Sequence, residues 1–285
     1  FCAGKRILNH YRIHYIAQNP TYHYKVTKNF DASGFNSTIP GFSGTFDGGY
    51  YTISRLNAPL FASANGATIK NIVLDQVNIT GGTGNIGAIV GTASGATRIY
   101  NCGVLSGTIG GGTYVGSIAG RINDEARVIN CYSFANITGG TTVGGIVGYN
   151  SVASNAGNLK TLVMNCMFYG DITGGTSVSP IYGGAKISNH GAEGNANGIN
   201  NYNYYRYEAN ITPTVYNCAL AAEERYLTRF EFYRHVLNSQ RKLCAFYVTG
   251  SVDNYEEIAK WVLDTADPNA PEYACIKALM DAVDE

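Results

Sequence analysis

The fold follows from a repeated sequence whose first copy reads Ala67-Thr-Ile-Lys-Asn-Ile-Val-Leu74, then Asn78-Ile-Thr-Gly-Gly82, then Ile86-Gly-Ala-Ile-Val-Gly91. Its three phrases return with a period of about 30 residues up to residue 183, and a partial fifth copy follows. The Asn that anchors the first phrase recurs as Asn71, Asn101, Asn130, Asn165 and Asn217. Such a period in a Gly-rich, strand-like sequence is typical of proteins built from stacked repeats.

The first phrase of each copy carries two apolar columns that lie three residues apart. The columns are Ile69/Ile99/Val128/Val163/Val215 and Ile72/Cys102/Cys131/Cys166/Cys218. Strict alternation along a strand would place these columns on opposite faces, so both can point inward only if the chain bends at the intervening Asn. Asn tolerates a left-handed backbone, and its amide can bond to the Asn one repeat away. The sequence therefore predicts two interior ladders, one of Asn71, Asn101, Asn130, Asn165 and Asn217 and one of Cys102, Cys131, Cys166 and Cys218.

The third phrase repeats the pattern with Gly between its apolar columns. These columns are Ile86/Val115/Val143/Val178 and Ile89/Ile118/Ile146/Ile181. Gly87, Gly116 and Gly144 are expected to adopt a conformation that other residues resist. No helical stripe runs through the copies, and one copy cannot bury its own interior. Since parallel crossovers are nearly always right-handed, the predicted fold is mainly β: a right-handed parallel β-helix, or solenoid, with coils of about 30 residues.

The rest of the chain is expected to flank this solenoid. Residues 1–29 are predicted to form cap strands, from the alternation of Tyr11, Ile13 and Tyr15 and of Tyr22, Tyr24 and Val26. The β-helix should occupy residues 30–220, with an Asn/Tyr-rich insertion at 184–213. Residues 221–285 contain capping signals and amphipathic spacing that predict a small C-terminal helical cap.

The insertion holds the candidate binding residues. They are Tyr202, Tyr204, Tyr205, Arg206 and Tyr207. Rigid aromatic area beside polar neighbours suits a contact with a glycan or a protein, although the same tyrosines could pack the loop onto the solenoid flank.

Catalytic chemistry is not evident in the repeats. Sugar hydrolysis needs two neighbouring carboxyl groups, but the acids at 67–183 are scattered: Asp75, Asp124, Glu125 and Asp171. His10 and His14 have metal-ligand spacing only if their segment is a helix, and no third ligand is near. The Cys column is expected to hold free thiols that fill the core, with disulfides between neighbouring copies as the alternative that their distance allows. The sequence thus predicts no catalytic residue, no metal, no cofactor and no enzymatic activity.

Composition limits the partners. The 285 residues have a net charge of +0, and only 14% are charged, so nothing indicates nucleic acid or an anionic membrane. No apolar run approaches the roughly 20 residues that span a bilayer. The 35 Gly and 22 Tyr are typical of extracellular β-rich bacterial proteins. Residue 1 is not Met, and we expect a processed end or a cut within a longer chain.

Two motifs carry a family resemblance. Val143-Gly-Gly-Ile-Val-Gly148 resembles the GLUG motif of bacterial surface proteins, some IgA peptidases among them, and Phe42-Ser-Gly-Thr-Phe-Asp-Gly-Gly-Tyr-Tyr-Thr-Ile53 resembles the coil that precedes such motifs. The resemblance implies an architecture and brings no catalytic residues. The predicted function is a non-enzymatic, adhesin-like binding or spacer module at a bacterial surface or in secreted form. Its partners would be a glycan or protein, further domains of a longer chain, or neighbouring subunits. The alternatives are a segment of an extracellular fibre and a carbohydrate-active β-helix enzyme.

Overall fold

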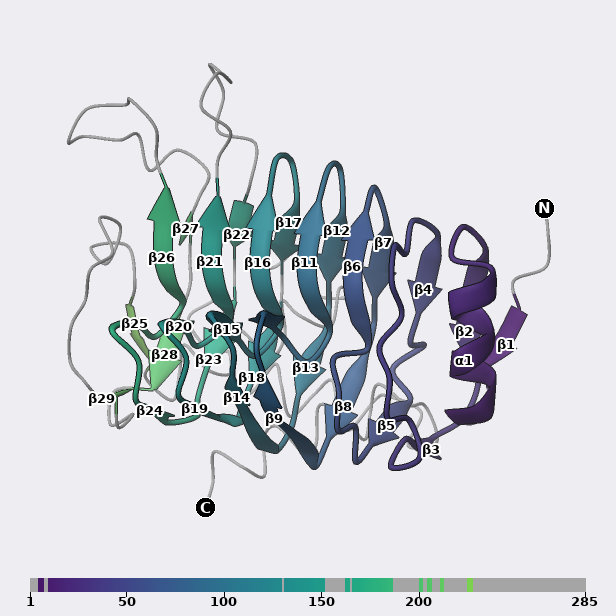
Figure 1. The fold of residues 1–285 in the computed structure, drawn as a ribbon, viewed down its shortest axis with the longest axis horizontal. Helices are drawn as coiled ribbons and strands as arrows, with labels where there is room; N and C mark the ends of the chain where they lie inside the picture. Colours follow the sequence, from purple (N-terminus) through teal and green to yellow (C-terminus); the bar gives the residue numbers. More distant parts are fainter. Residues whose placement is uncertain are drawn as a thin grey trace, which may run out of the picture.

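A computed structural model describes residues 5–7, 10–129, 131–151, 162–164, 166–186, 200–201, 204–206, 211–212 and 225–227. Within these residues the protein is mainly β, with one helix, α1 (His10–Gln18), at one end of a stack of strands (Figure 1). The described strands form five sheets, here called A to E.

The two longest sheets run along the whole stack. Sheet A contains, in order, β1 (Lys5–Ile7), β2 (His23–Val26), β4 (Thr45–Asp47), β7 (Thr68–Lys70), β12 (Arg98–Tyr100), β17 (Arg127–Ile129), β22 (Leu162–Met164) and β27 (Asn200–Asn201). Sheet B contains β3 (Phe30–Asp31), β5 (Thr52–Ser54), β8 (Val73–Asp75), β13 (Gly103–Val104), β18 (Tyr132–Ser133), β23 (Met167–Phe168), β28 (Tyr204–Arg206) and β30 (Arg225–Leu227).

Three shorter sheets complete the stack. Sheet C contains β6 (Phe61–Asn65), β11 (Val90–Ser94), β16 (Ala119–Asn123), β21 (Val147–Ser151) and β26 (Tyr182–Lys186). Sheet D contains β9 (Val77–Gly82), β14 (Gly107–Gly111), β19 (Asn136–Thr138), β24 (Ile172–Thr173) and β29 (Ile211–Thr212). Sheet E contains β10 (Asn85–Ile86), β15 (Tyr114–Gly116), β20 (Thr142–Gly144) and β25 (Ser177–Ser179).

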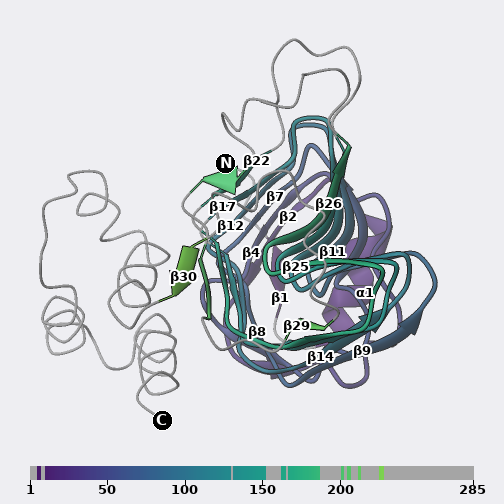
Figure 2. The same ribbon diagram turned by 90° about the vertical axis from the view of Figure 1, so that its left-hand side faces the viewer.

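Each sequence copy contributes one strand to every sheet, in the order A, B, D, E, C, and the strands of each sheet are parallel. The register joins equivalent residues of successive copies: Ile99 pairs with Ile69 on one side and with Val128 on the other. Seen along the stack, the copies lie one behind another (Figure 2). The predicted mainly β fold with parallel pairing is confirmed.

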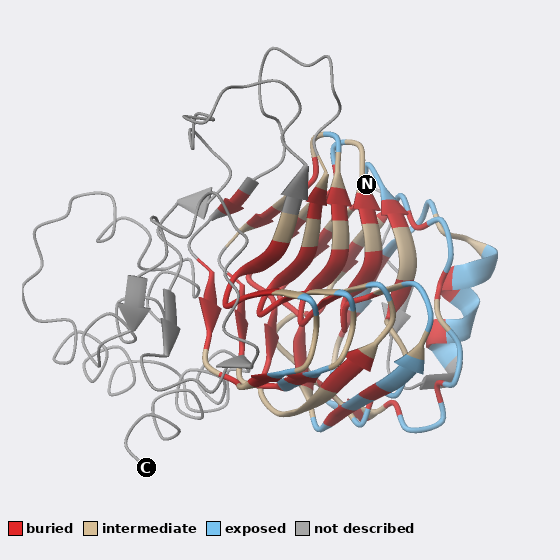
Figure 3. Cartoon of the chain, turned by 60° about the vertical axis from the view of Figure 1, so that its left-hand side comes forward, coloured by how far each residue is buried: buried red, intermediate tan, exposed pale blue. Residues whose placement is uncertain are grey.

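The core lies between the sheets, where buried residues recur along the strands whose burial is described (Figure 3). The predicted apolar columns are inside it: Ile69, Ile99, Val128 and Val163 are all fully buried, as are Ile72, Cys102, Cys131 and Cys166. The side chains that fill the core thus come from equivalent positions of successive copies. Val215 and Cys218 lie outside the described residues.

The glycines of the third phrase have a different role from the predicted one. None of Gly87, Gly116 and Gly144 adopts a left-handed conformation. A Cβ on Gly116 would instead lie 2.4 Å from Ala119 O and 2.6 Å from Gly148 N, and one on Gly144 would lie 2.6 Å from Gly183 N. Strands of sheets E and C therefore meet here backbone against backbone, with no room for a side chain.

The ends of the chain depart from the sequence prediction. Residues 10–18 form α1, not a strand, because Ile13 and Ile16, three residues apart, are both buried in the core. The expected alternation at residues 22–26 is present in β2, where Tyr24 and Val26 are buried. At the other end, 225–227 forms strand β30, which pairs with β28, so the predicted helical cap is not supported. The other residues of 221–285 lie outside the described part.

One polar side chain interrupts the apolar core column of sheet C. Asn150 follows Ala93 and Ile122 in register, is fully buried, and has no hydrogen-bond partner for either Nδ2 or Oδ1. Replacing it with Leu, which has a similar volume, removes two unsatisfied polar atoms. We expect Asn150→Leu to raise the free energy of unfolding by about 1–3 kcal/mol.

Urea denaturation followed by far-UV circular dichroism measures this gain. The control is Asn85→Leu, because the Asn85 amide donates to Thr92 Oγ1 at 2.8 Å and is partly exposed. That substitution should not stabilise the protein. An unfolding midpoint for Asn150→Leu at or below that of the unaltered chain would contradict the expectation.

Candidate functional site

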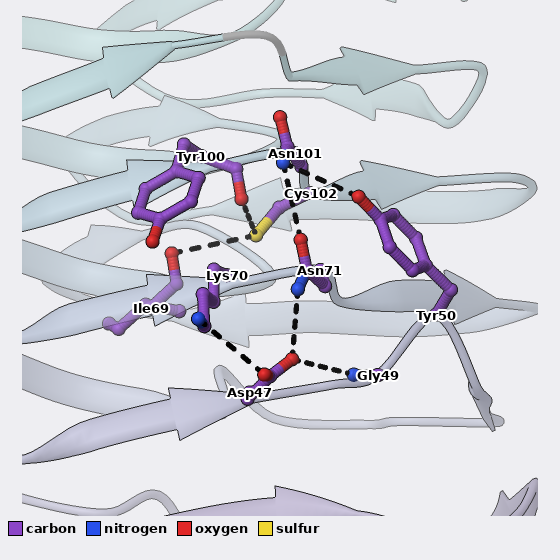
Figure 4. Close-up of polar contacts among 9 residues, drawn as sticks. All are labelled: Asp47, Gly49, Tyr50, Ile69, Lys70, Asn71, Tyr100, Asn101 and Cys102. Atoms are coloured by element: carbon purple, nitrogen blue, oxygen red, sulfur yellow. Dashed lines mark hydrogen bonds and ion pairs between the residues drawn. The ribbon is translucent and has the colours of Figure 1, made fainter. Parts of the chain in front are cut away.

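The first polar cluster is the start of the Asn ladder, which lies at the bends between sheets A and B (Figure 4). Asn101 Nδ2 donates to Asn71 Oδ1 at 3.2 Å, and Asn71 Nδ2 donates to Asp47 Oδ1 at 2.9 Å. Both Asn residues are buried and have left-handed backbones, with φ of 55° at Asn71 and 54° at Asn101. The ladder therefore satisfies buried amides while it turns the chain.

Asp47, the last residue of β4, precedes the first copy and accepts the hydrogen bond from Asn71 that begins the ladder. Its Oδ1 also accepts the Gly49 N–H at 2.9 Å, and its Oδ2 lies 3.6 Å from Lys70 Nζ (Figure 4). A carboxylate held by amide donors and one ammonium group is a structural terminus, since its acceptor sites are occupied within the chain. Asn130, Asn165 and Asn217 lie outside the described residues.

The Cys ladder is part of the core. Cys102, Cys131 and Cys166 are free and fully buried. The Cys102 and Cys131 thiols each lie 3.3 Å from a carbonyl of their own copy, Tyr100 O and Ile129 O, and 3.9 Å from a carbonyl of the preceding copy. The Cys166 thiol lies 3.7 Å from Val128 O of the preceding copy. Burial holds the pKa of the Cys102 thiol well above its usual value, so the thiol stays neutral and is not a nucleophile.

A second cluster, here called the tyrosine-arginine cluster, lies where sheets E and C meet. It consists of Tyr114, Arg121 and Tyr149. The two rings stack with centroids 4.5 Å apart and planes at 15°, and Arg121 Cζ lies 5.9 Å from each centroid. Arg121 Nη2 also donates to Ser151 Oγ at 3.3 Å. All three side chains are partly exposed, and burial raises the pKa of Tyr149.

The cluster is part of a polar row that each copy extends by one pair of residues. One member lies two residues before the Gly-x-Ile-x-Gly phrase, which reads Ser179-Pro-Ile-Tyr-Gly183 in the fourth copy, and the other directly follows the last Gly of the phrase. The pairs are Asn85/Thr92, Tyr114/Arg121, Thr142/Tyr149 and Ser177/Gly184. The Asn85–Thr92 hydrogen bond and the Tyr114–Arg121 contact show that the two members face each other across the bend.

Sequence reasoning missed this cluster. The signal was available, because the two members of each pair are seven residues apart in every copy. It was overlooked since the residue types vary from copy to copy, whereas the core columns stay apolar. The predicted binding residues lie elsewhere: Tyr204, Tyr205 and Arg206 have backbones in β28, paired with β23 and β30 rather than in a loop. Tyr202 and Tyr207 lie outside the described residues.

No metal centre was found in the part of the chain that the structure describes, because no three His, Cys, Asp or Glu side chains there could hold an ion. His10 and His14 do share helix α1. However, the Nδ1 atom of His14 lies 3.4 Å from Ser37 Oγ, and the His14 ring packs against Phe35. Of the acids in the repeats, Asp75 accepts from Ser106 Oγ at 2.7 Å and Asp124 from the Gly95 N–H at 3.3 Å. None of the described helices is long and apolar enough to cross a membrane.

Part of the chain is similar to immunoglobulin A1 peptidases. Residues 11–106, about a third of the chain, match the family described as the M26 IgA1-specific metallo-endopeptidase N-terminal region. An immunoglobulin A1 protease from Streptococcus sanguinis is 46% identical over 70 residues, which is 24% of this chain and 4% of that protein.

Two solved structures match this chain. A structure named IgA1 protease matches 72% of this chain and 21% of its own, with a TM-score of 0.51 and 19% identity. A Bacteroides ovatus protein described as a candidate immunoglobulin A1 protease matches 73% of this chain and 76% of its own, with a TM-score of 0.47 and 16% identity. The chain therefore spans a small part of the curated relative and of the first of these structures.

These findings correct the functional predictions. The expected membership of a GLUG-motif surface family is wrong, because the family model that matches is that of the M26 IgA1 peptidases. The predicted non-enzymatic, adhesin-like function and the expectation of no enzymatic activity are contradicted by the same finding, because the family model and the curated relative that match are those of peptidases. The motifs that suggested the GLUG family specify how repeats pack, and they carry no information on chemistry.

Proposed function

We propose that this chain is part of an IgA1-specific metallo-endopeptidase, in which it forms a rigid body of the N-terminal region that holds the antibody substrate. The observation that carries the proposal is the match of residues 11–106 to the N-terminal region of that family. These residues run from α1 into the loop that follows β13, so they include at least one strand of every described sheet. The identity of 46% to a Streptococcus sanguinis immunoglobulin A1 protease supports the same assignment.

We also propose that the described strands wind as a right-handed parallel β-helix. Support comes from the order A, B, D, E, C, which recurs in each copy, and from the parallel pairing of equivalent residues. The handedness follows from the strong preference of parallel crossovers for the right-handed connection. A β-helix suits a substrate-holding body because its flank presents a long, stiff surface.

The metal ion that a metallo-endopeptidase requires would polarise the scissile carbonyl and activate water. The described residues do not fit such an ion, since they contain no group of three suitable ligands. We therefore assign no hydrolytic step to them. Their proposed part is to bind and orient the antibody, and the tyrosine-arginine cluster is the described surface feature best suited to contact it. An extracellular location on a bacterium accords with an antibody substrate.

Binding of IgA1 by the purified 285-residue chain tests the proposal. Biolayer interferometry with immobilised IgA1 should give saturable binding, and immobilised IgG of equal density should give none. An excess of the chain should also slow cleavage of IgA1 by the Streptococcus sanguinis protease, because the two would compete for the antibody. Absence of binding to IgA1, or equal binding to IgG, would overturn the proposal.

A further inference from the structure

Among the described residues, the column that holds Arg121 and Tyr149 ends at Gly184, which has no side chain. Thr92, Arg121 and Tyr149 occupy one column of sheet C, and the next residue in that column is Gly184. The Tyr149 ring stacks on Tyr114 of the preceding copy, and Gly184 of the following copy is in register with Tyr149. A Cβ on Gly184 would lie 3.2 Å from Tyr149 Cδ2 and 3.4 Å from Cε2. A side chain here would therefore stand against the ring, and the sequence supplies none.

Arg121 precedes Tyr149 in this column, and its guanidinium lies at the edge of the two stacked rings, 5.9 Å from each centroid. In the described part of the chain the ion pairs are Arg55 with Asp31 and Lys70 with Asp47, so no described carboxylate pairs with Arg121. Its guanidinium contacts two aromatic rings and one hydroxyl, and its buried Nε has no hydrogen-bond partner. A guanidinium held in this way keeps donors available for a carboxylate, which it can bind through two parallel hydrogen bonds.

The neighbouring side chains are rich in hydroxyl groups. Ser151 Oγ accepts from Arg121, and Thr142 is in register with Tyr114. In the next copy, Ser177 donates its hydroxyl to Gly183 O at 2.6 Å. A tyrosine face attracts the C–H groups on the flat side of a sugar ring, because the ring face is electronegative and these hydrogens are slightly positive. Hydroxyl groups at the edge then match the hydroxyls of the sugar. A peptide side chain would need an apolar pocket, which this row of small polar residues does not offer.

We propose that Tyr149, Arg121 and Gly184 form a binding site for a carboxylate-bearing sugar, whose ring stacks on Tyr149 above Gly184 and whose carboxylate pairs with Arg121. The site stands on local geometry and does not depend on the proposed antibody substrate. If both proposals hold, this is where an acidic glycan of the substrate is held. Binding of free sugars and binding of IgA1 are measured separately, so either can fail without the other.

Saturation-transfer NMR and calorimetric titration with N-acetylneuraminic acid, glucuronic acid and neutral glucose test the site. We expect both acidic sugars to bind and glucose to bind at least about tenfold more weakly, which is the size of effect that a lost charged hydrogen bond produces. Tyr149→Ala and Arg121→Gln should each weaken binding of the acidic sugars by about tenfold or more. Arg127→Gln, in sheet A, is the matched control and should bind as the unaltered chain does.

Gly184→Thr tests the site without removing a contact residue. It places a side chain in the stacking position, as Thr92 does in the first copy, and the Gly184 backbone is not left-handed, so the fold should persist with a small rotation of Thr142. We expect an unchanged melting temperature and loss of sugar binding, whereas Gly84→Thr, with open space around it, should bind normally. The proposal is overturned if the unaltered chain binds neither acidic sugar, if glucose binds equally well, or if Arg121→Gln or Gly184→Thr retains full affinity.

Discussion

Gly116→Ala should destabilise the protein by about 3 kcal/mol or more, the upper end of what overpacking of a core costs. The added methyl would lie 2.4 Å from Ala119 O, 2.6 Å from Gly148 N and 2.7 Å from Ile146 O. All three are backbone atoms fixed by the sheets, so no side-chain rotation relieves the contact. The expected result is a large loss of thermal stability from one methyl group.

The control is Gly84→Ala, because a Cβ there meets nothing within 4 Å and the backbone is not left-handed. We expect its free energy of unfolding to stay within about 0.5 kcal/mol of the unaltered value. Guanidinium denaturation of the three proteins gives the comparison. Equal stability of Gly116→Ala and Gly84→Ala would show that sheets E and C do not meet in this way.

The fourth copy has Ser179 where the earlier copies have the Gly that lets sheets E and C approach each other. Ser179 occupies the position equivalent to Gly144, with which it is in register. A Cβ added to Gly144 would clash with Gly183 N and Tyr182 Cα, which belong to the following copy. Among the described strands β25 and β26 end their sheets, so the Ser179 Cβ meets no further strand.

Asn101→Ala should cost about 2–4 kcal/mol, for two reasons that add. The substitution leaves the buried Asn71 Oδ1 without the donor that lies 3.2 Å from it, and it removes the contact of 3.4 Å with the Tyr50 hydroxyl. It also places Ala at a φ of 54°, a left-handed conformation that Ala tolerates less well than Asn.

Asn101→Gly separates the two causes. Gly accepts the left-handed backbone but makes no side-chain bond, so its loss should be smaller than that of Ala by about 1 kcal/mol. Denaturation curves of both variants provide the test. If Gly is as destabilising as Ala, the backbone conformation contributes nothing, and if neither variant loses stability, the ladder is not a stabilising element.

Much of the stack could be predicted from the sequence, because apolar columns at a fixed period leave few alternatives. Ile69, Ile99, Val128 and Val163 are paired in register as their spacing indicates. The left-handed Asn71 and Asn101 also follow from pattern, since two inward residues three apart require a bend between them. Repetition made these inferences strong, because each copy is an independent instance of the same pattern.

Single-copy features were harder to predict. The alternation of Tyr11, Ile13 and Tyr15 suggested a strand, but burial of Ile13 with Ile16 shows that a helical spacing was also present. The role of Gly116 could not be predicted, because the sequence does not distinguish a Gly that allows close backbone approach from a Gly that allows a left-handed turn. The function could not be derived, because the repeated residues specify packing. The positions of Tyr114, Arg121 and Tyr149 hold different residue types in the other copies, so no repeated pattern marks them.

Disulfide cross-linking on the exposed face of sheet D tests the central claim, that equivalent residues of successive copies lie side by side. Thr108 and Asn136 are in register on β14 and β19, so their Cα atoms should be about 4.8 Å apart, within the range that a disulfide spans. Under mild oxidation, the double variant Thr108→Cys/Asn136→Cys should form this cross-link in most molecules, as read by peptide mapping. Thr108→Cys/Thr138→Cys, displaced by two residues, should form little. Equal cross-linking of both pairs, or none in the first, would contradict the stacked register.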